Sequence, residues 1–126
     1  MLDIDHFKVI NDTHGHDVGD DALRVFSQNI QANLRDTDVA GRLGGEEFAV
    51  LLIETDITGA LDLANRLRQA VTDIHLAAGD REVRYTVSIG VSGLEPDECV
   101  ERLLHRADVA LYEAKRKGRN SVMCAP

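Results

Sequence analysis

The sequence predicts a layered domain of the α/β or α+β class, with a β-hairpin built around a Gly-Gly pair. Along the chain, stretches with apolar residues at helical spacing alternate with stretches that have the pattern of strands. The pair Gly44-Gly45 separates two strand-like stretches and is a strong turn signal. No repeat, low-complexity tract or linker divides the 126 residues, so one domain over residues 1–126 is expected.

The first predicted elements are a strand end, a short helical turn and a longer helix. Residues 1–5 have the pattern of the last part of a buried strand, and residues 6–13 that of a helical turn. A glycine-containing loop over residues 15–19 should follow, and a helix is expected to begin at Asp20 or Asp21. The apolar stripe of this helix consists of Leu23, Phe26, Ile30 and Leu34.

The hairpin and a second long helix occupy the middle of the chain. Strands are predicted over residues 38–43 and 46–53, with the glycine pair between them. The continuous apolar run over residues 48–53 is typical of a central, buried strand. A helix is expected near residues 58–74. Its apolar stripe consists of Ala60, Leu63, Leu67, Ala70, Val71 and Ile74.

The last predicted elements are a strand, a helix and a short closing strand. After a turn at residues 78–80, apolar and polar residues alternate over residues 83–91, which predicts one half-buried strand. A helix is expected to begin at Pro96-Asp97, because proline suits a first helical turn, and Gly118 is a plausible C-cap. Residues 121–124 should form the closing strand.

Composition narrows the class of function. The net charge of -8, the absence of Trp and an aromatic content of 4% argue against a nucleic-acid-binding surface. The two cysteines, Cys99 and Cys124, form no C-x-x-C unit and are expected to be small, semi-buried thiols in a reducing compartment. No apolar run has the length of a membrane span, and no signal peptide is visible. A cytoplasmic location is predicted for this segment, and a membrane anchor elsewhere in the parent protein stays open.

Three carboxylates near predicted turns could form a cation site. Asp3 ends the first strand, and Glu46-Glu47 follow the glycine pair of the hairpin. Mg²⁺ prefers hard oxygen ligands and often uses one or two protein carboxylates. Because side chains alternate along a strand, only one of the two glutamates should join Asp3, unless the turn breaks the alternation. The alternative is that all three are solvated charges near turns.

Other residues allow a phosphate site. Lys115 and Arg119 are four positions apart and could share a helix face, although cations near a helix end also suit the helix dipole. The bare backbone of the glycine pair could let a nucleotide approach closely, or could simply form a tight hairpin. His14 and His16 are a weak metal pair, since no third ligand lies at suitable spacing. The sequence has neither a G-x-x-x-x-G-K-[ST] loop nor a G-x-G-x-x-G fingerprint after a strand.

Four ordered strings carry a family resemblance that spans nearly the whole chain. They are RLGGEEF at 42–48, DIDHFK at 3–8 with Asn11-Asp12, GHDVGD at 15–20, and a C-terminal set with Ala107-Asp108, Tyr112, Ala114-Lys115 and Gly118-Arg119-Asn120. The chain resembles GGDEF-domain diguanylate cyclases in their GGEEF form. This resemblance implies a central mixed β-sheet flanked by helices, similar to class III nucleotide cyclases and the polymerase palm.

The resemblance also implies roles for individual residues. Asp3, Glu46 and Lys115 are the expected catalytic residues, and Glu46 would also assist deprotonation of a ribose 3′-hydroxyl. Asp3 and Glu46, with the Ile4 backbone carbonyl, would hold Mg²⁺, with Mn²⁺ as an alternative ion. The role of Glu47 is left open. For GTP, Asn11 and Asp20 are expected to read the guanine, and His16 to lie against the nucleotide. Lys8, Lys115 and Arg119 would hold the phosphates, together with backbone N–H groups near His6 and Phe7. Gly44 and Gly45 of the hairpin are also expected to contact GTP.

The activity implied by the resemblance is condensation of two GTP molecules into cyclic di-GMP with release of two pyrophosphates. Each domain would hold one GTP, so a homodimer is expected, with a sensory or regulatory domain N-terminal to it in the parent protein. Arg35-x-x-Asp38, with Arg66, resembles the family's product-inhibition site. The alternatives are an exposed loop with ordinary ion pairs and, for the whole domain, a non-catalytic receptor for GTP or cyclic di-GMP.

The start of the chain differs from the family pattern. Domains of this family normally begin with a D-x-L-T-G-L-x-N-R stretch, a helix and the first half of the central strand, and the sequence contains none of these. The chain is therefore expected to be truncated at its N-terminus relative to the family. Apolar surface should be left uncovered where that helix packs.

Overall fold

The computed structural model describes all residues from 1 to 126 and confirms the alternation of strands and helices. The elements are β1 (Leu2–Ile4), α1 (Phe7–His14), α2 (His16–Asn33), β2 (Val39–Gly44), β3 (Glu47–Leu51), α3 (Ile57–Thr72), β4 (Leu76–Ala78), β5 (Arg81–Val83), β6 (Val87–Val91), α4 (Val100–Arg116) and β7 (Val122–Cys124). None of the helices is long and apolar enough to cross a membrane.

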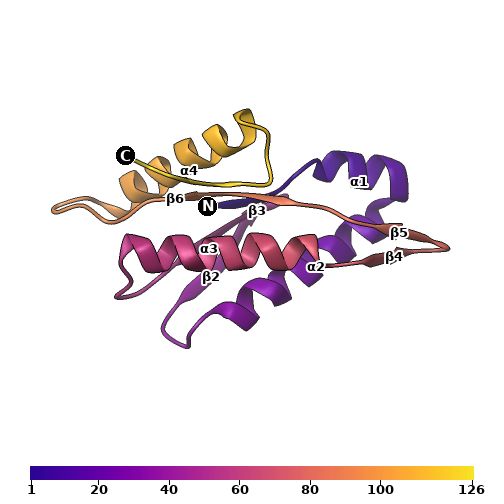
Figure 1. Ribbon diagram of the computed structural model, residues 1–126, viewed down its shortest axis with the longest axis horizontal. Helices are drawn as coiled ribbons and strands as arrows, with labels where there is room; N and C mark the ends of the chain where they lie inside the picture. Colours follow the sequence, from indigo (N-terminus) through magenta and orange to yellow (C-terminus); the bar gives the residue numbers. More distant parts are fainter.

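Five strands form a mixed central sheet in the order β2-β3-β1-β6-β7. Only β6 and β7 run parallel, and β4 and β5 form a separate hairpin that projects from one end of the molecule (Figure 1). The short strand β1 lies in the middle, between β3 and β6. Asp3 is therefore held opposite Glu47 on one side and Ser88 on the other.

Helices cover both faces of the sheet (Figure 1). The main core joins one face to α2 and α3, and its buried residues include Leu2, Phe26, Val71 and Ile89. The rings of Phe26 and Phe48 meet edge to face there, with centroids 5.1 Å apart. Helix α4 covers the opposite face. Because side chains alternate along a strand, residues such as Asp3 and Ser88 point toward the α4 face.

Gly90 in β6 is what allows α4 to approach the sheet so closely. A Cβ atom at this position would lie 2.1 Å from the Ala107 carbonyl oxygen and 2.3 Å from the Leu111 backbone nitrogen. Both atoms belong to the backbone of α4, which no rotamer change can move away. The glycine therefore sets the distance between the sheet and the helix that carries Lys115.

Two helices begin at different residues from those predicted. Helix α2 begins at His16 rather than at Asp20 or Asp21, because the break falls at Gly15, which has a φ of 92°, whereas Gly19 is buried inside the helix. Helix α4 begins at Val100 rather than at Pro96-Asp97, because Asp97 has a left-handed φ of 61° that no helix continues through.

The strand predicted over residues 83–91 is two strands. Strand β5 ends at Val83, and β6 begins at Val87. Between them, the Arg84 guanidinium donates a hydrogen bond to the Thr72 carbonyl (2.6 Å) and the buried Tyr85 hydroxyl donates to the Ala22 carbonyl (3.1 Å). These contacts preserve the in-and-out alternation of side chains, which is why the pattern did not reveal the interruption.

The apolar run after the hairpin is less buried than predicted. Of residues 48–53 only Phe48 is buried, and Ile53 is 44% exposed. The later part of the run lines an apolar groove of about 450 Å³ between α3, α4 and the ends of β3 and β6. Both Cys99 and Cys124 are exposed, so the expectation of semi-buried thiols is wrong.

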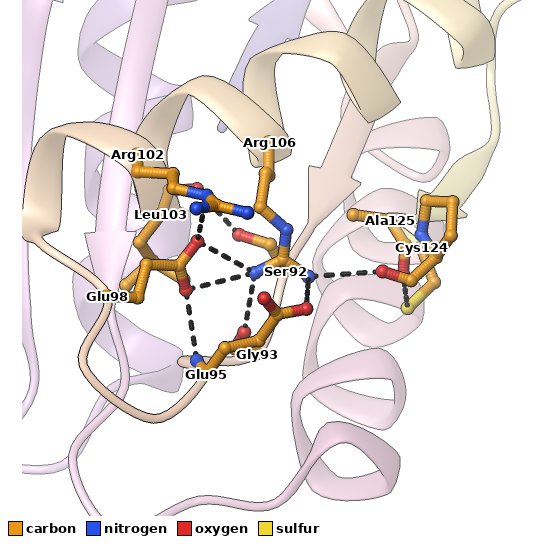
Figure 2. Close-up of polar contacts among 10 residues, drawn as sticks. Ser92, Gly93, Glu95, Glu98, Arg102, Leu103, Arg106, Cys124 and Ala125 are labelled. Carbon is orange, nitrogen blue, oxygen red and sulfur yellow. Dashed lines mark hydrogen bonds and ion pairs between the residues drawn. The ribbon is translucent and has the colours of Figure 1, made fainter.

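A cluster around Arg106 ties the loop before α4 to the end of the chain (Figure 2). The Arg106 guanidinium donates to both carboxylate oxygens of Glu98 (3.0 and 3.2 Å), to the Gly93 carbonyl (2.9 Å) and to the Pro126 carbonyl (3.1 Å). The Glu95 N–H also donates to Glu98, and these contacts hold the pKa of the Glu98 carboxyl below its usual value. Arg106 therefore links α4 to the loop that precedes it and to the last residue of the chain.

Candidate functional site

The site is centred on Asp3 in the middle strand. Asp3 is 2% exposed, and one of its carboxylate oxygens, Oδ1, is buried with no hydrogen-bond partner. The other oxygen, Oδ2, accepts a hydrogen bond from the Lys115 ammonium of α4. A buried polar atom without a partner is rare in proteins and often marks a place where a ligand or ion binds.

The electrostatics of Asp3 favour a cation. Burial raises the pKa of its carboxyl to about 6, the Lys115 ammonium opposes this shift, and the negative charges of Glu46 and Glu47 add to it. The protein alone therefore does not fully balance the negative charge of the ionised Asp3 carboxylate. A hard divalent cation on Oδ1 would supply the missing positive charge, so the donor set fits a metal such as Mg²⁺.

Asp3→Asn should stabilise the metal-free protein at neutral pH. The folded protein binds a proton at Asp3 more tightly than the unfolded chain, because the pKa rises from 3.8 to about 6 on folding. Stability therefore falls as pH rises through this window, and a neutral amide avoids that loss. In EDTA at pH 7.5, the melting temperature of Asp3→Asn should exceed that of the wild type by a few degrees.

The difference between the two melting temperatures should shrink toward pH 4, where the wild-type carboxyl is itself neutral. Lys115 can hydrate once its partner is neutral, since 31% of its side chain is exposed. A variant that is less stable than the wild type at pH 7.5 would contradict this account of the Asp3 environment.

The turn of the hairpin differs by one residue from the predicted turn. Gly44 ends β2 and pairs with Glu47, so the turn itself consists of Gly45 and Glu46. Gly44 and Gly45 have φ values of 155° and 50°, and the Arg42 guanidinium donates to the Gly45 carbonyl (2.8 Å). Of these two glycines, the left-handed φ at Gly45 clearly favours glycine.

This turn breaks the strict alternation of the two glutamates. Glu47 lies directly opposite Asp3 in the sheet, and Glu46 precedes it in the turn. Both negative charges contribute to the raised pKa of Asp3. The exception named for the alternation, a turn that interrupts it, is thus met at Glu46. No group of three or more His, Cys, Asp or Glu side chains is arranged to hold a metal; this holds for His14 and His16 and also for Asp3, Glu46 and Glu47 taken together.

A second group of predicted residues lies where α1 meets α2. The Asn11 side-chain oxygen Oδ1 is buried with no partner, and it occupies the space that a side chain at Gly19 would need. A Cβ atom at Gly19 would lie 1.8 Å from that oxygen. Phe7 packs partly against the core, whereas His16, the first residue of α2, is exposed. The corner thus presents one unsatisfied acceptor.

Asp20 lies farther along α2, beside a cleft of about 350 Å³ between this helix and the hairpin. Leu23 and Arg42 line the same cleft. Lys8, in contrast, is exposed on α1, with its ammonium 3.9 Å from the Asp12 carboxylate. The structure shows no contact between Lys8 and the Asp3–Lys115 pair.

The sequence-based expectation that Lys115 and Arg119 could share a helix face is wrong. Helix α4 ends at Arg116, with Lys117 as its C-cap, and Gly118 follows with a φ of 121°. Arg119 lies in the turn after the helix with a left-handed φ of 63°. Only Lys115 reaches Asp3 from the helix itself, and the position of Arg119 depends on what holds the turn.

The proposed regulatory residues divide into a bonded pair and a free arginine. The Arg35 guanidinium donates to both Asp38 oxygens (3.2 and 3.3 Å) and to the hydroxyl of Thr55 (2.7 Å), and the Ile53 N–H also donates to Asp38 (3.1 Å). The hydrogen bonds from Arg35 lower the pKa of Asp38. These contacts of Arg35 and Asp38 hold the two strands together at the base of the hairpin. Arg66 on α3 is exposed and makes no hydrogen bond or ion pair.

Two residues near the site were missed by reasoning from the sequence. The sequence predicts Gly19 in a loop, whereas it lies inside α2 and its missing side chain makes room for Asn11. Asp5 is 4% exposed and accepts three hydrogen bonds. The run of Asp3, Ile4 and Asp5 gave an available signal, since side chains two apart on a strand share a face.

Comparisons with known proteins all point to the same family. The family model described as "Diguanylate cyclase, GGDEF domain" matches residues 1–121. The chain is 44% identical over 126 residues to the response regulator PleD of Caulobacter vibrioides, covering 98% of this chain and 28% of that protein. It is 43% identical over 123 residues to diguanylate cyclase A of Treponema denticola, covering 97% and 33% of the two chains. The chain thus spans about a third or less of the length of these relatives.

Solved structures agree with the same fold. The GGDEF domain of DgcB from Caulobacter crescentus, in complex with c-di-GMP, has a TM-score of 0.95 at 36% identity, over 98% of this chain and 74% of that one. The active GGEEF domain of a diguanylate cyclase from Vibrio cholerae has a TM-score of 0.90 at 36% identity, over 99% and 80%. The predicted central mixed sheet flanked by helices is confirmed.

Proposed function

The chain belongs to the GGDEF family of diguanylate cyclase domains, and on that premise we propose that it condenses two GTP molecules into cyclic di-GMP with release of two pyrophosphates. The observation that carries this proposal is the buried, unpartnered oxygen of Asp3, whose carboxylate bonds the Lys115 ammonium and is subject to the negative charges of Glu46 and Glu47. Such a site is suited to a metal ion and a phosphate together.

The metal would be Mg²⁺, with Mn²⁺ as an alternative. The carboxylates of Asp3 and Glu46 and the backbone carbonyl of Ile4 would hold it, and these are the oxygen donors that Mg²⁺ prefers. When bound, the ion stabilises negative charge on the attacking oxygen and on the phosphates. In its absence the Lys115 ammonium is the only cation that bonds Asp3.

The guanine would be read at the corner of α1 and α2. Guanine presents N–H donors at N1 and N2, and the unpartnered Oδ1 of Asn11 is an acceptor of the required kind. Asp20, beside the cleft between α2 and the hairpin, is a second acceptor. His16 would lie against the nucleotide. The bare backbone of Gly44 and Gly45 would allow close approach.

The triphosphate would be held by cations and by backbone N–H groups. Lys115 and Arg119 come from the end of α4 and from the turn after it, and Lys8 comes from α1. The free N–H groups at the start of α1, near His6 and Phe7, suit an anion because they have no partner inside the helix. The exposed ammonium of Lys8 can turn toward the phosphates from its weak pairing with Asp12.

In the reaction, the 3′-oxygen of one GTP attacks the α-phosphorus of the other. A new O–P bond forms, the bond to pyrophosphate breaks, and the 3′-hydroxyl proton passes to Glu46 and then to water. Repetition in the opposite direction closes the ring. Because each domain would hold one GTP, two copies must meet face to face, and the precise placement of the two nucleotides supplies much of the rate.

The test is incubation of the purified protein with GTP and Mg²⁺, with cyclic di-GMP and pyrophosphate measured together. Two pyrophosphates per cyclic di-GMP are expected, with loss of turnover in EDTA and a specific activity that rises with protein concentration. A folded protein that binds GTP or cyclic di-GMP without forming product would instead be a non-catalytic receptor. A folded protein that binds neither nucleotide would overturn both functions.

We also propose product inhibition through Arg35, Asp38 and Arg66. Arg35 is partly committed to Asp38 and to the base of the hairpin, so its removal would also loosen the hairpin. Arg66 makes no hydrogen bond or ion pair, so its substitution tests the proposed site without loosening the hairpin. Arg66→Ala should raise the concentration of cyclic di-GMP that gives half-inhibition roughly tenfold or more, with the initial rate unchanged. Arg81→Ala, an exposed arginine of the separate hairpin, is the matched control.

A further inference from the structure

Asp5 is a buried carboxylate that has no role in the proposed mechanism. It directly follows β1 and is 4% exposed. Its Oδ1 accepts a hydrogen bond from the Ser88 hydroxyl (2.6 Å), and its Oδ2 accepts from the Thr86 hydroxyl (2.6 Å) and from the Asn120 backbone N–H (3.0 Å). A charge buried in this way needs several donors, and these three come from two different parts of the chain.

The Asn120 contact reaches the turn that carries Arg119. Three successive residues there have positive φ values, 121° at Gly118, 63° at Arg119 and 44° at Asn120. For residues other than glycine this conformation is disfavoured, so surrounding contacts must hold it in place. Figure 1 shows the chain reversing after α4 at this turn and running back along β6.

Several contacts hold this turn. The Gly118 N–H donates to the Lys115 carbonyl (3.3 Å), and Ser121, which follows the turn, accepts from the Ile89 N–H of β6 (3.0 Å). The Arg119 N–H donates to the Ala114 carbonyl at the end of α4 (3.0 Å), and the Arg68 guanidinium donates to the Asn120 side-chain oxygen (3.1 Å). Both of these contacts connect the turn to helices. The bond from the Asn120 N–H to Asp5 connects it to the metal-site strand, two residues from Asp3.

We propose that Asp5 is a positioning residue that fixes the turn of Arg119 against the strand of Asp3, and so sets where the triphosphate is held relative to the metal site. This inference rests on the proposed function. A carboxylate suits the task because all three of its partners are donors and it can accept from each of them, whereas an amide has only one accepting oxygen. Bonds to an ionised acceptor are also stronger than neutral ones.

The experiment measures binding of α,β-methylene GTP, which cannot release pyrophosphate, in the presence of Mg²⁺. The variants are Asp5→Asn, Asp5→Ala and Arg119→Ala, together with each Asp5 variant combined with Arg119→Ala. Ser88→Ala is the matched control, because it removes a bond to the same carboxylate and leaves the Asn120 contact intact. Guanosine, which has no phosphate, is titrated in parallel to isolate the phosphate contribution.

Asp5→Ala is expected to weaken binding of the triphosphate roughly tenfold, Asp5→Asn less, and neither should change binding of guanosine. In the Arg119→Ala background the loss caused by Asp5 substitution should disappear, because the residue that Asp5 positions is gone. Ser88→Ala should bind nearly as the wild type does. Should Asp5→Ala fail to fold, the comparison is made with Asp5→Asn alone.

The inference is overturned if the wild type and Arg119→Ala differ in triphosphate affinity but the Asp5 variants bind normally. It is also overturned if the losses from Asp5 and Arg119 simply add, because a residue that only stabilises the fold would act equally in both backgrounds. A folded wild type that binds neither GTP nor its analogue would overturn the proposed function as well, and the wild-type titration alone shows which of the two has failed.

Discussion

Glu46→Gln is expected to reduce the formation of cyclic di-GMP from GTP roughly 10³-fold or more, by removing a metal ligand and a proton acceptor together. The substitution keeps the size of the side chain and leaves the turn of the hairpin intact. It also removes one of the negative charges that raise the pKa of Asp3, so the fold should not lose stability. Turnover should be followed by product formation, and folding by thermal melting.

Glu47→Gln is the matched control for this prediction. Glu47 lies directly opposite Asp3 in the sheet and acts on the same pKa, so it shares the electrostatic surroundings of Glu46. If Glu46 acts as a ligand and base, the loss at Glu47 should be smaller by at least about tenfold. Equal losses at both positions would mean that the negative charge of the hairpin matters, and would remove the specific role of Glu46.

Gly90→Ala is expected to destabilise the domain by more than about 3 kcal/mol, enough to leave much of a marginally stable protein unfolded. The added Cβ would stand 2.1 Å from the Ala107 carbonyl oxygen, and relief requires α4 to move as a whole. Any molecules that stay folded should bind nucleotide poorly, because α4 carries Lys115. Urea denaturation followed by circular dichroism gives the free energy of unfolding.

Gly41→Ala provides the comparison within the same sheet. Gly41 lies in β2, and a Cβ there would have no atom within 4 Å. The free energy of unfolding should therefore change by no more than about 1 kcal/mol, with strand propensity favouring alanine slightly. A Gly90→Ala protein as stable as Gly41→Ala would show that α4 can shift at little cost, against the close contact described above.

The fold could be predicted from local patterns wherever packing agrees with the chain's own periodicity. The stripe of Leu23, Phe26 and Ile30 predicted α2, and these residues are buried in the core. The same patterns failed at positions whose conformation depends on distant contacts. Residues 84–86 leave the ladder while Tyr85 keeps its inward direction through Ala22 of α2. Alternation reports which side chain faces inward, and it does not report which backbone is paired.

The sequence names the residues of the proposed site but says less about how they are arranged. The strings around Asp3 and the hairpin identified the residues on which the proposed chemistry depends. Their arrangement was predicted less well: Lys115 and Arg119 were expected on one helix face, yet a left-handed turn places Arg119 beyond the helix. Spacing along a helix has meaning only as far as the helix extends, and the end of α4 is set by Gly118 and by the contacts of the turn.

The sequence by itself determined the class of fold, the family and the identity of the charged groups, because these follow from the order of residue types along the chain. Tertiary structure alone decided which groups are deprived of water. Burial in the middle of the sheet leaves Asp3 with an unpartnered oxygen and raises its pKa to about 6, and the same sheet brings Asp5 to the N–H of Asn120. Desolvation and long-range hydrogen bonding depend on the packing of segments more than a hundred residues apart, and no local pattern encodes that packing.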